Sequence, residues 1–509
     1  MASRLLPLVL LTATSLFAQA RSQWVYFGAD HLLHYRTDGQ GNRIMDFSYA
    51  GYRGGGVPLP NPPAIRHVSP SDGDATTRIQ AAIDSVSKRL PDKAGFRGAV
   101  VLEPGNYDLE GTLTIAASGV VLRGSGSGDG GTVIKLTGQP HRFLEIHGSG
   151  KPQVAANSAW ITDSYVPSGA DTLHVDHSDD YHPGDSVFVE RPVTAEWIHY
   201  MGMDALVRDN NAQTWIKAGS VIRTDRVIKA VSNNRITLDV PLSDSLDAKM
   251  VSPPGADLVK YTFPGRIADS GVEALRVVAP FEDVPISGRQ FTVLQMEAVT
   301  DGWARDIAVE ETQNGVTIGS TAKRVSIENV RIVHSKPHSG SAAPADFSIS
   351  GTQILLDRCS VMGEGTWPVV TQAQVTGPNV VLDFSADHGG VAPHQRWATG
   401  LLVDHSEFQG TTAKKQGIAF SNRGTAGSGH GWDIGWAVAW NVKSPYFLVL
   451  QPPGAKNWCI GCTGESVPLE GFNGGIFDCP NATVAPVSLY LEQLRERLGD
   501  QALAAMGRP

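Results

Sequence analysis

The chain of 509 residues contains 42 Lys and Arg against 51 Asp and Glu, a formal net charge of −9. No basic run stands out, so the charge pattern argues against nucleic acid or an anionic membrane as a partner. Gly (55 residues) and Pro (31) are plentiful and only 18% of the residues are charged, which favours many short strands with tight turns over a helical protein.

The first 20 residues have the pattern of a secretory signal peptide. Arg4 precedes an apolar stretch from Leu5 to Phe17, and Ala18-Gln19-Ala20 is a small-x-small cleavage pattern. The stretch is too short to span a bilayer, and no later apolar run is long enough to be a membrane span. We therefore predict cleavage near Ala20 and a secreted protein, either extracellular or periplasmic.

The next two segments, residues 21–65 and 66–157, are predicted to begin a solenoid. The first is polar and rich in Gly and Pro. We expect it to be a lead-in that covers one end, because an open solenoid end exposes core and strand edges. The second starts with a short amphipathic helix, since Ile79, Ile83 and Val86 share one helical face. The short apolar runs that follow predict the strands of the first coils.

Residues 158–250 alternate apolar and polar side chains, which is the pattern of short antiparallel strands. We interpret this segment as a small inserted β subdomain beside the solenoid. Between its strands lies Glu196-Trp197-Ile198-His199-Tyr200, which we expect to form a loop that reaches over the binding groove.

In residues 251–483 short apolar runs recur, and one such step, from Val381 to Leu402, is 21 residues long. Such periods indicate stacked coils that bury their apolar sides on one another, so this segment is predicted to be the main β-helix and to carry the site. Residues 484–509 are predicted to form a C-terminal helical cap on the last coil, with an apolar stripe. The stripe consists of Leu491, Leu494, Leu498 and Leu503.

The four cysteines are Cys359, Cys459, Cys462 and Cys479. Export permits disulfides, and we expect either a disulfide or plain packing, with Cys459 or Cys462 bonded to Cys479 as the favoured pair. Cys459-x-x-Cys462 is also the pattern of half a zinc site, but no second pair or nearby His completes it.

One segment carries a specific family resemblance. The sequence from Asp74 to Asp84 and from Gly98 to Gly126, DATTRIQAAID followed by GAVVLEPGNYDLEGTLTIAASGVVLRGSG, closely resembles the opening coils of pectate-lyase-superfamily proteins. The resemblance implies an all-β chain folded as a right-handed parallel β-helix, a pectin-lyase-like solenoid. The superfamily includes polysaccharide lyases, glycosidases and phage tailspikes, so the motif indicates the fold and not the reaction.

A second block, with DFSYAGYRGGG from Asp46 and SLYLEQLRERLG from Ser488, extends the resemblance to nearly all of the mature chain. HxRWxTG from His394, NRG from Asn422, GSGHGW ending at Trp432 and WN ending at Asn441 are similar to a subgroup of secreted bacterial β-helix proteins related to pectate lyases. This similarity implies an extracellular carbohydrate-active protein.

The same block concentrates side chains that suit an acidic polysaccharide. Six of the 11 Trp lie between positions 367 and 458, and indole faces stack on the C–H surfaces of sugars. Arg can hold a uronate carboxylate through two parallel hydrogen bonds, and His can bind or release a proton near neutral pH. Coils stack about 4.8 Å apart, so these side chains can converge on one groove.

Three functions fit these residues, and a polysaccharide lyase is the first. β-Elimination needs a base for the C5 proton, a group that neutralises the uronate, and an acid for the leaving oxygen. We assign His394, Arg396 and His430 to catalysis, with Arg396 and Arg423 as the carboxylate clamp. Calcium, which often serves the carboxylate in such lyases, is the one cofactor considered. The predicted substrate-binding residues are Trp397, Arg423, Trp432, Asn441 and Trp197.

The second function is a glycoside hydrolase, which needs two carboxylates. Gly429-His430-Gly431 resembles the Gly-His-Gly motif of polygalacturonases, but no Arg-x-Lys follows it and Asp179-Asp180 lies far upstream. The candidate carboxylates are Asp383, Asp387, Asp404 and Asp433.

The third function is a non-catalytic glycan-binding or adhesive β-helix. The mixture of His and Arg with Trp favours an enzyme, because binding alone does not need titratable groups. We therefore predict a monomeric enzyme that acts on an acidic polysaccharide, with elimination ahead of hydrolysis.

Overall fold

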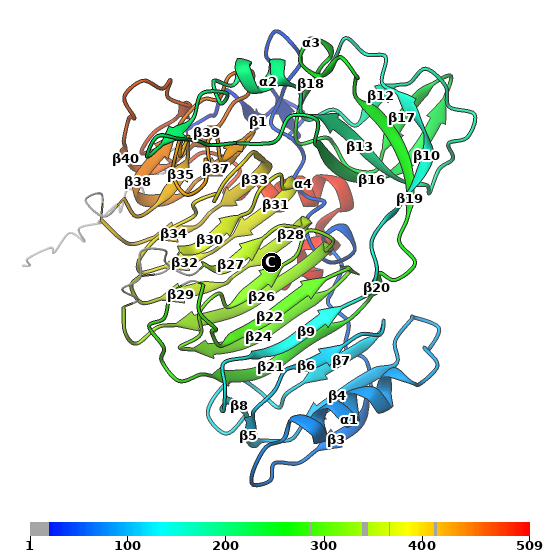
Figure 1. The fold of residues 1–509 in the computed structure, drawn as a ribbon, viewed down its shortest axis with the longest axis vertical. Helices are drawn as coiled ribbons and strands as arrows, with labels where there is room; N and C mark the ends of the chain where they lie inside the picture. The colour runs from blue at the N-terminus through cyan, green and yellow to red at the C-terminus, as the bar shows by residue number, and fades with distance from the viewer. Residues whose placement is uncertain (1–19, 286, 338–344, 366, 412–414, 509) are drawn as a thin grey trace, which may run out of the picture.

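Short apolar runs separated by turns form parallel strands that stack coil upon coil, and they confirm the predicted parallel β-helix (Figure 1). The computed structural model describes residues 20–285, 287–337, 345–365, 367–411 and 415–508. The predicted signal peptide lies outside the described residues, except for Ala20. Within the described part of the chain, no helix is both long and apolar enough to cross a membrane.

Three flanks of parallel strands surround the core. One flank is a six-stranded sheet of β6 (Leu113–Ile115), β9 (Arg142–His147), β22 (Thr292–Glu297), β25 (Val316–Ile318), β27 (Ala345–Ile349) and β30 (Trp367–Thr371). The other two flanks merge into one large sheet, because long strands such as β21 (Gly271–Val278) bend from one flank to the next. The first half of β21 pairs with β7 (Val120–Arg123) and its second half with β8 (Thr132–Leu136).

The remaining strands of the large sheet are β3 (Ala64–Val68), β4 (Gly98–Leu102), β5 (Gly105–Leu109), β20 (Ile267–Ala268), β23 (Val299–Thr300), β24 (Trp303–Glu310), β26 (Lys323–Val333), β28 (Thr352–Asp357), β29 (Ser360–Met362), β31 (Thr376–Leu382), β32 (Ser385–Ala386), β33 (Ala398–Asp404), β34 (Glu407–Phe408), β35 (Ile418–Phe420), β36 (Ile434–Gly435), β37 (Val438–Trp440), β38 (Lys443–Val449), β39 (Trp458–Ile460), β40 (Thr463–Ser466) and β41 (Ile476–Asp478).

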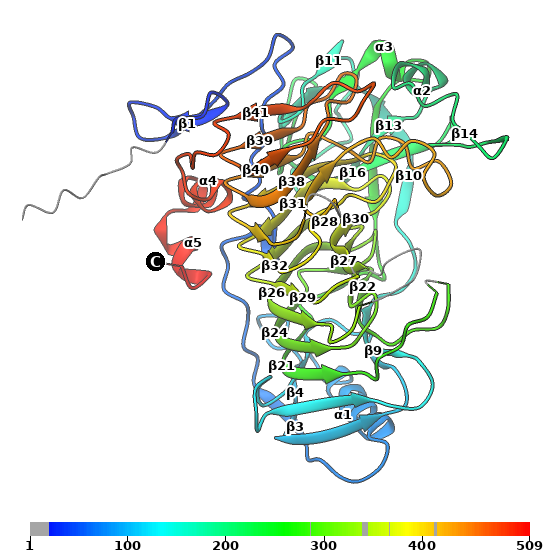
Figure 2. The ribbon, with the colours of Figure 1, turned by 90° about the vertical axis from the view of Figure 1, so that its left-hand side faces the viewer.

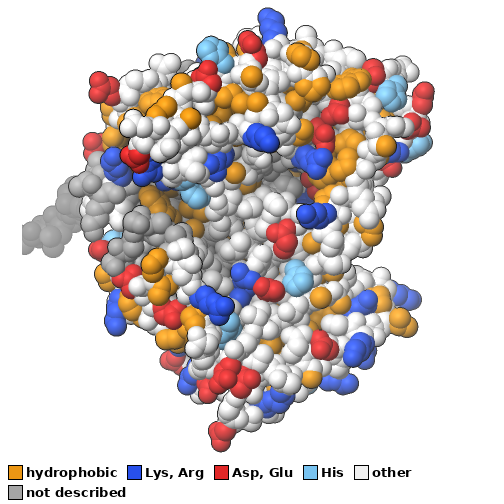
Figure 3. Space-filling view, viewed as in Figure 1, with side chains coloured by type: hydrophobic (Ala, Val, Ile, Leu, Met, Phe, Trp, Pro, Cys, Tyr) orange, Lys and Arg blue, Asp and Glu red, His pale blue; other side chains and the backbone are white. Residues whose placement is uncertain are grey.

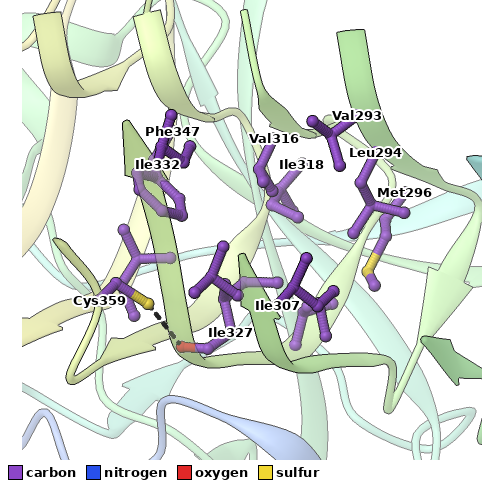
Figure 4. Close-up of a cluster of buried hydrophobic side chains, with 14 of the residues drawn as sticks. Val293, Leu294, Met296, Ile307, Val316, Ile318, Ile327, Ile332, Phe347 and Cys359 are labelled. Atoms are coloured by element: carbon purple, nitrogen blue, oxygen red, sulfur yellow. Dashed lines mark hydrogen bonds between the residues drawn. The ribbon is translucent and has the colours of Figure 1, made fainter. Parts of the chain in front are cut away.

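Inward-pointing side chains of successive coils fill the interior. Figure 4 shows Leu294, Val316 and Phe347 from three neighbouring coils, together with Ile307 and Ile327 from the opposite flank. All five are buried, and burial of such side chains is the main favourable term in folding. The apolar runs in the sequence therefore mark the core side of each coil.

The cysteines belong to this packing and not to disulfides. All four are free thiols, so the favoured pairing of Cys459 or Cys462 with Cys479 is wrong. Cys359 and Cys462 point into the core, where the Cys359 thiol donates to the Ile327 carbonyl oxygen at 3.3 Å. Plain packing, the alternative to a disulfide, therefore describes the buried cysteines.

The inserted subdomain is antiparallel, as predicted. Its sheet runs in the order β10 (Gln153–Trp160), β19 (Asp257–Thr262), β13 (Ser186–Pro192), β16 (Val221–Ser232), β17 (Arg235–Leu238) and β12 (Thr172–His174). Val187, Val189 and Leu258 bury one face in a separate small core. The buried Arg226 guanidinium ties the subdomain to the coils, because its Nη2 donates to the carbonyl oxygens of Pro241 at 2.7 Å and Gly377 at 2.8 Å.

The segment expected to be a loop over the groove is a helix, α2 (Ala195–Tyr200). The Thr194 hydroxyl caps it by accepting from the Trp197 backbone N–H at 3.0 Å. The prediction of a loop was wrong because the signal for this helix, the capping hydroxyl of Thr194, is short-range and lies in a segment whose residues have a strand-like pattern. The shorter elements of this region are β11 (Tyr165–Val166), β14 (Val207–Arg208), β15 (Asn211–Ala212), β18 (Leu246–Asp247) and α3 (Ala248–Val251).

The two terminal segments cover a flank of the β-helix and not its ends (Figure 2). The lead-in contains β1 (Val25–Phe27), β2 (Leu33–Tyr35) and η1 (Tyr52–Gly54), and the C-terminal stripe forms α4 (Leu489–Leu498) and α5 (Asp500–Ala505). Both pack on outward apolar side chains of the large sheet such as Leu355 and Val380. The end cap is instead α1 (Thr76–Ser87), whose predicted face of Ile79, Ile83 and Val86 is buried.

We predict that this flank contributes strongly to stability. Leu494 in α4 is fully buried between the lead-in and the sheet, so Leu494→Ala should lower the free energy of unfolding by roughly 2–5 kcal/mol. The measurement is urea unfolding followed by circular dichroism. Leu90→Ala is the control, because Leu90 is 90% exposed and its loss should change stability by less than about 0.5 kcal/mol. Equal unfolding midpoints for both variants would show that the terminal helices do not support the coils.

Candidate functional site

The outer face of the six-stranded sheet carries a column of polar positions. Neighbouring strands are paired in register, for example Glu297 of β22 with His147 of β9 and Thr371 of β30 with Ile349 of β27. Because side chains alternate along a strand, the same outward position recurs once per coil. The column consists of His147, Glu297, Gly319, Ser350, Gln372 and His394.

A groove lies between this column and the inserted subdomain. It contains two adjoining cavities of about 640 Å³ and 320 Å³, which share Pro152, Arg223, Ser320 and Thr321 in their walls. Figure 3 shows this face hollowed, with acidic, basic and histidine side chains around the hollow. Five coil steps separate His147 from His394, or about 24 Å at ~4.8 Å per step.

At the β9 end of the groove, Glu145, His147 and Glu297 line the larger cavity. The Glu297 carboxylate is held in place, because its Oε1 accepts from the Thr321 backbone N–H at 3.0 Å. The residue beneath it is Gly319, where any side chain would overlap the Glu297 carboxylate. Glu145 is paired with Arg142, and its Oε2 lies 3.7 Å from His147 Nε2. This end therefore holds two fixed carboxylates on neighbouring strands.

At the other end, the predicted catalytic residues come together. The imidazole rings of His394 and His430 are in edge-to-face contact with centroids 4.7 Å apart. Gln372 holds the first ring, since its Oε1 lies 2.9 Å from His394 Nδ1. Arg423 Nη1 donates to the His394 carbonyl oxygen at 2.7 Å, and the Arg396 backbone N–H donates to the His430 carbonyl oxygen at 3.0 Å. We call His394, Arg396, Arg423 and His430 the histidine–arginine cluster.

The cluster adjoins the groove. The smaller cavity ends at Ala373 and Gln374, directly after Gln372, and the Gln374 backbone N–H donates to the Arg396 carbonyl oxygen at 2.9 Å. The Gln372 side chain also donates to Ser348 Oγ at 2.8 Å. Hydrogen bonds between successive coils thus connect the groove floor to the histidines.

Burial and positive neighbours make both imidazoles weak bases. Desolvation, followed by the charges of Arg423 and Arg396, lowers the pKa of His394 to about 4. The same causes, with His394 added, lower the pKa of His430 to about 4. Burial also lowers the pKa of Arg423, against the attraction of Asp433. At neutral pH the cluster therefore holds two neutral imidazoles beside two guanidinium groups.

A tight loop places His430 against His394. Asn422 and Trp432 form an antiparallel bridge at the base of the loop, and Arg396 Nη2 donates to Ser428 Oγ at 2.7 Å across it. Gly427 has a φ of +58°, and a side chain there would overlap the His430 imidazole. In the described residues, His430 Nδ1 is buried and has no hydrogen-bond partner, so this imidazole is positioned by packing.

The predicted sugar-stacking tryptophans were assigned wrongly. Trp197, Trp397 and Trp432 are only 3%, 2% and 3% exposed, so none can present an indole face to a sugar. Trp397 Nε1 donates to Asp244 Oδ2 at 2.8 Å and Trp432 Nε1 to the Met201 carbonyl oxygen at 3.1 Å. Trp197 packs edge-to-face on Trp397 at 5.7 Å. These rings join the inserted subdomain to the coils and fix the backbone beside Arg396 and His430.

Asn441 is also structural. Its amide donates to the carbonyl oxygens of Val484 and Val487 at 2.9 Å each, and its oxygen accepts from the Val484 backbone N–H at 2.9 Å. It therefore holds the segment before α4 and does not reach the groove. Arg423, the remaining predicted binding residue, does belong to the cluster.

The four candidate aspartates do not form a hydrolytic pair. Asp404 and Asp433 are buried at 0% and 1% exposure, and each accepts hydrogen bonds from neighbouring backbone N–H groups. Asp383 is paired with His405 and Arg508, and Asp387 accepts from the Gly363 backbone N–H. Asp225 lines the smaller cavity of the groove and is paired with Lys323 and Arg266. The carboxylates that line the larger cavity are Glu145 and Glu297. The outward positions of Glu145 and Glu297 on their strands were the sequence signal that could have identified them. The insertion separates the two strands in the chain, so no regular spacing relates the two residues.

Calcium would require several oxygen ligands around one point. In the part of the chain that the structure describes, no group of three or more His, Cys, Asp or Glu side chains is arranged to hold a metal ion. Of the groove carboxylates, Glu297 accepts from the Thr321 backbone N–H, Glu145 is paired with Arg142, and Asp225 is paired with Lys323 and Arg266. These residues therefore do not fit a calcium site.

No protein-family model matches the chain, and no curated protein matches it either. Among solved structures, the tailspike protein of E. coli bacteriophage HK620 in complex with a pentasaccharide is similar over 89% of this chain and 68% of its own, with 10% identity and a TM-score of 0.40. The tailspike protein gp49 of Pseudomonas phage LKA1 is similar over 79% of this chain and 70% of its own, with 14% identity and a TM-score of 0.32. The gp54 tailspike of Acinetobacter baumannii bacteriophage AP22 in complex with a capsular saccharide is similar over 81% of this chain and 73% of its own, with 10% identity and a TM-score of 0.28. Nothing about the reaction follows from similarities at this level.

The lowered pKa values predict a pH dependence of stability. Between the ordinary His value of 6.5 and the folded value of about 4, the unfolded chain binds a proton that the folded chain does not. Stability therefore falls as the pH is lowered through this window. His430→Gln should make the urea midpoint less sensitive to pH between 6.5 and 4.5 than it is in the wild type. An unchanged slope would show that His430 is already solvated in the folded protein.

Proposed function

We propose that this chain is an enzyme that cleaves a uronic-acid-containing polysaccharide by β-elimination at the histidine–arginine cluster. The observation that supports this most is the contact of two neutral imidazoles, 4.7 Å apart, beside two guanidinium groups at the end of an open groove. One neutral imidazole can accept the C5 proton, the imidazolium formed in this way can donate a proton to the leaving oxygen, and the guanidinium groups supply the carboxylate clamp that elimination needs.

The proposed reaction breaks the C5–H bond and the C4–O glycosidic bond and forms a C4–C5 double bond. Arg396 and Arg423 bind the uronate carboxylate, which makes the C5 proton more acidic. One imidazole takes that proton, and the pair returns a proton to the departing glycosidic oxygen. The electron pair of the C5–H bond becomes the new double bond, and no external oxidant or cofactor is required.

Because the pKa of both imidazoles is low, their strength as bases depends on whether an acidic substrate is bound. In the free protein the two guanidinium groups disfavour a third positive charge, so both imidazoles are weak bases. A bound uronate supplies negative charge beside the arginines, which raises the pKa of the imidazoles toward its ordinary value. The base thus becomes effective when the acidic sugar is in place.

The groove gives this reaction a binding surface for a long substrate. It extends about 24 Å along the coils, so several sugar rings can lie between His394 and His147. We also propose that the mature chain acts as a monomer outside the cytoplasm, after cleavage near Ala20.

Hydrolysis is the second candidate function. Glu145 and Glu297 lie on neighbouring strands and both line the larger cavity. Two carboxyl groups across a sugar are the requirement of a glycoside hydrolase. The histidine–arginine cluster would then bind the acidic part of the substrate without reacting with it.

The two functions predict different products and different inactive variants. We expect the purified mature protein to release unsaturated uronates, seen by ultraviolet absorbance, together with reducing ends from an acidic polysaccharide. His394→Ala and His430→Ala should each lower kcat about 100-fold or more, and EDTA or added calcium should have little effect.

Glu297→Gln is the matched control, since it changes a groove residue without removing a member of the cluster. It should keep the absorbance signal. Reducing ends without absorbance, lost in Glu297→Gln and kept in His430→Ala, would instead establish hydrolysis. Loss of folding in both histidine variants, seen by circular dichroism, would show that the histidines are structural.

A further inference from the structure

The inserted subdomain presents one row of sugar-binding chemistry across four neighbouring strands. Asp257 of β19 lies opposite Trp160 of β10 on one side and opposite Glu190 of β13 on the other, and Glu190 lies opposite Arg223 of β16. Directly opposite residues in antiparallel strands point to the same face. Trp160, Asp257, Glu190 and Arg223 therefore form a row, which we call the insertion row.

The insertion row faces away from the subdomain's own core. The sequence neighbours Ala159, Leu258 and Val189 are buried in that core, so the alternating residues of the row point to the opposite side. Trp160 is 45% exposed, although Trp is usually buried. A large indole left open on a sheet face is available to a ligand.

The row begins in the groove and ends in a cavity of its own. Arg223 lines both groove cavities. At the other end a cavity of about 280 Å³ is lined by Trp160, Glu190 and Asp257, with Pro254 and Gly255 as its wall. Three strand spacings separate the two ends, or about 14 Å at ~4.8 Å per strand. A polysaccharide that leaves the groove past Arg223 can therefore continue to Trp160.

We propose that the insertion row is a binding site for a neutral, hydroxyl-rich sugar ring of the polysaccharide, with the ring stacked on Trp160 and its hydroxyls donated to Asp257. The inference rests on the proposed function only in taking a polysaccharide as the ligand. Two carboxylates and one guanidinium make the row net negative, and the Arg223 guanidinium is already engaged by Glu190 at 2.7 Å. A uronate would be repelled there, whereas a neutral ring is not.

The state of Asp257 agrees with this role. Burial, followed by the charge of Glu190, raises the pKa of Asp257 above its ordinary value, and hydrogen bonding to Ser158 opposes the rise. A partly desolvated carboxylate gains from accepting sugar hydroxyls, because charge-assisted hydrogen bonds are stronger than neutral ones. The substrate implied by the two sites together contains both acidic and neutral sugars.

Calorimetric titration of the inactive His430→Ala protein tests the proposal without cleavage. The probes are tetrasaccharides of glucose, galactose, mannose and xylose, compared with an oligogalacturonate. At least one neutral probe should bind, and Trp160→Ala should weaken it about tenfold or more while leaving oligogalacturonate binding unchanged. Trp160→Phe should keep most of the affinity, and Leu90→Ala, which also removes an exposed apolar side chain, should keep all of it.

In the active protein, Trp160→Ala should raise KM for the polysaccharide with kcat unchanged, as expected for a binding residue away from the reacting atoms. Neutral probes that do not bind, or that bind Trp160→Ala as tightly as the parent, overturn the proposal. If neutral probes bind through Trp160 but no unsaturated product is ever formed, the insertion row is supported as a binding site and the proposed lyase function is rejected. If the protein is a lyase and Trp160→Ala has the same KM as the wild type, the proposed lyase function is supported and the insertion row is rejected as a binding site.

Discussion

The register between neighbouring coils is the constraint on which the rest of the structure depends. Parallel strands pair residue by residue, so each inward apolar side chain lies on another, as Val316 does on Phe347. Buried Asn side chains help to keep this register by forming hydrogen bonds from coil to coil. Asn379 accepts from the Ile354 backbone N–H at 2.8 Å and donates to the Gly351 carbonyl oxygen at 3.1 Å. Such buried amides are stabilising only while their partners stay aligned, so they oppose a slip of one coil.

The same register creates the site. An outward position repeated once per coil becomes a straight column, and residues separated by a whole coil in sequence become neighbours about 4.8 Å apart. Gln372 can therefore hold His394, although 22 residues separate them. The electrostatics of the cluster follow from this packing as well. Asp433, whose charge acts on Arg423, is buried and its pKa is raised well above the ordinary value, which leaves the positive charge of the arginines incompletely balanced. In the proposed function, the uronate of the substrate supplies that missing charge.

Local sequence patterns predicted the strands, the face of α1 and the C-terminal helices, because each depends on the spacing of apolar residues within a short segment. They also brought His394, Arg396, Arg423 and His430 together, since these lie on neighbouring coils. The predictions that were wrong concern distant packing. Trp397 is aromatic and lies beside the cluster in sequence, yet its partner is Asp244 of the inserted subdomain. No periodicity within either segment could indicate that contact.

Glu145 and Glu297 are residues that line the groove and that the sequence patterns did not indicate, again because of distant packing. Their strands are adjacent in the sheet, but the whole inserted subdomain lies between them in the chain, so no regular period connects them. The insertion leaves the coils directly after β9 and returns just before β20. The two connecting segments are held together by a hydrogen bond from the Ser149 backbone N–H to the Gly265 carbonyl oxygen at 2.8 Å.

Because the insertion leaves and returns at the rim of the groove, the outer face of its sheet is placed beside the groove without any long connection. The coils and the outer face of the insertion sheet can therefore change independently of each other. The coil register fixes the groups that we propose to react, whose positions tolerate little change. The insertion has its own core and can vary the side chains of its outer face without disturbing a coil. In the proposed function, the choice of neighbouring sugars therefore depends on the insertion, and the chemistry depends on the stacked coils.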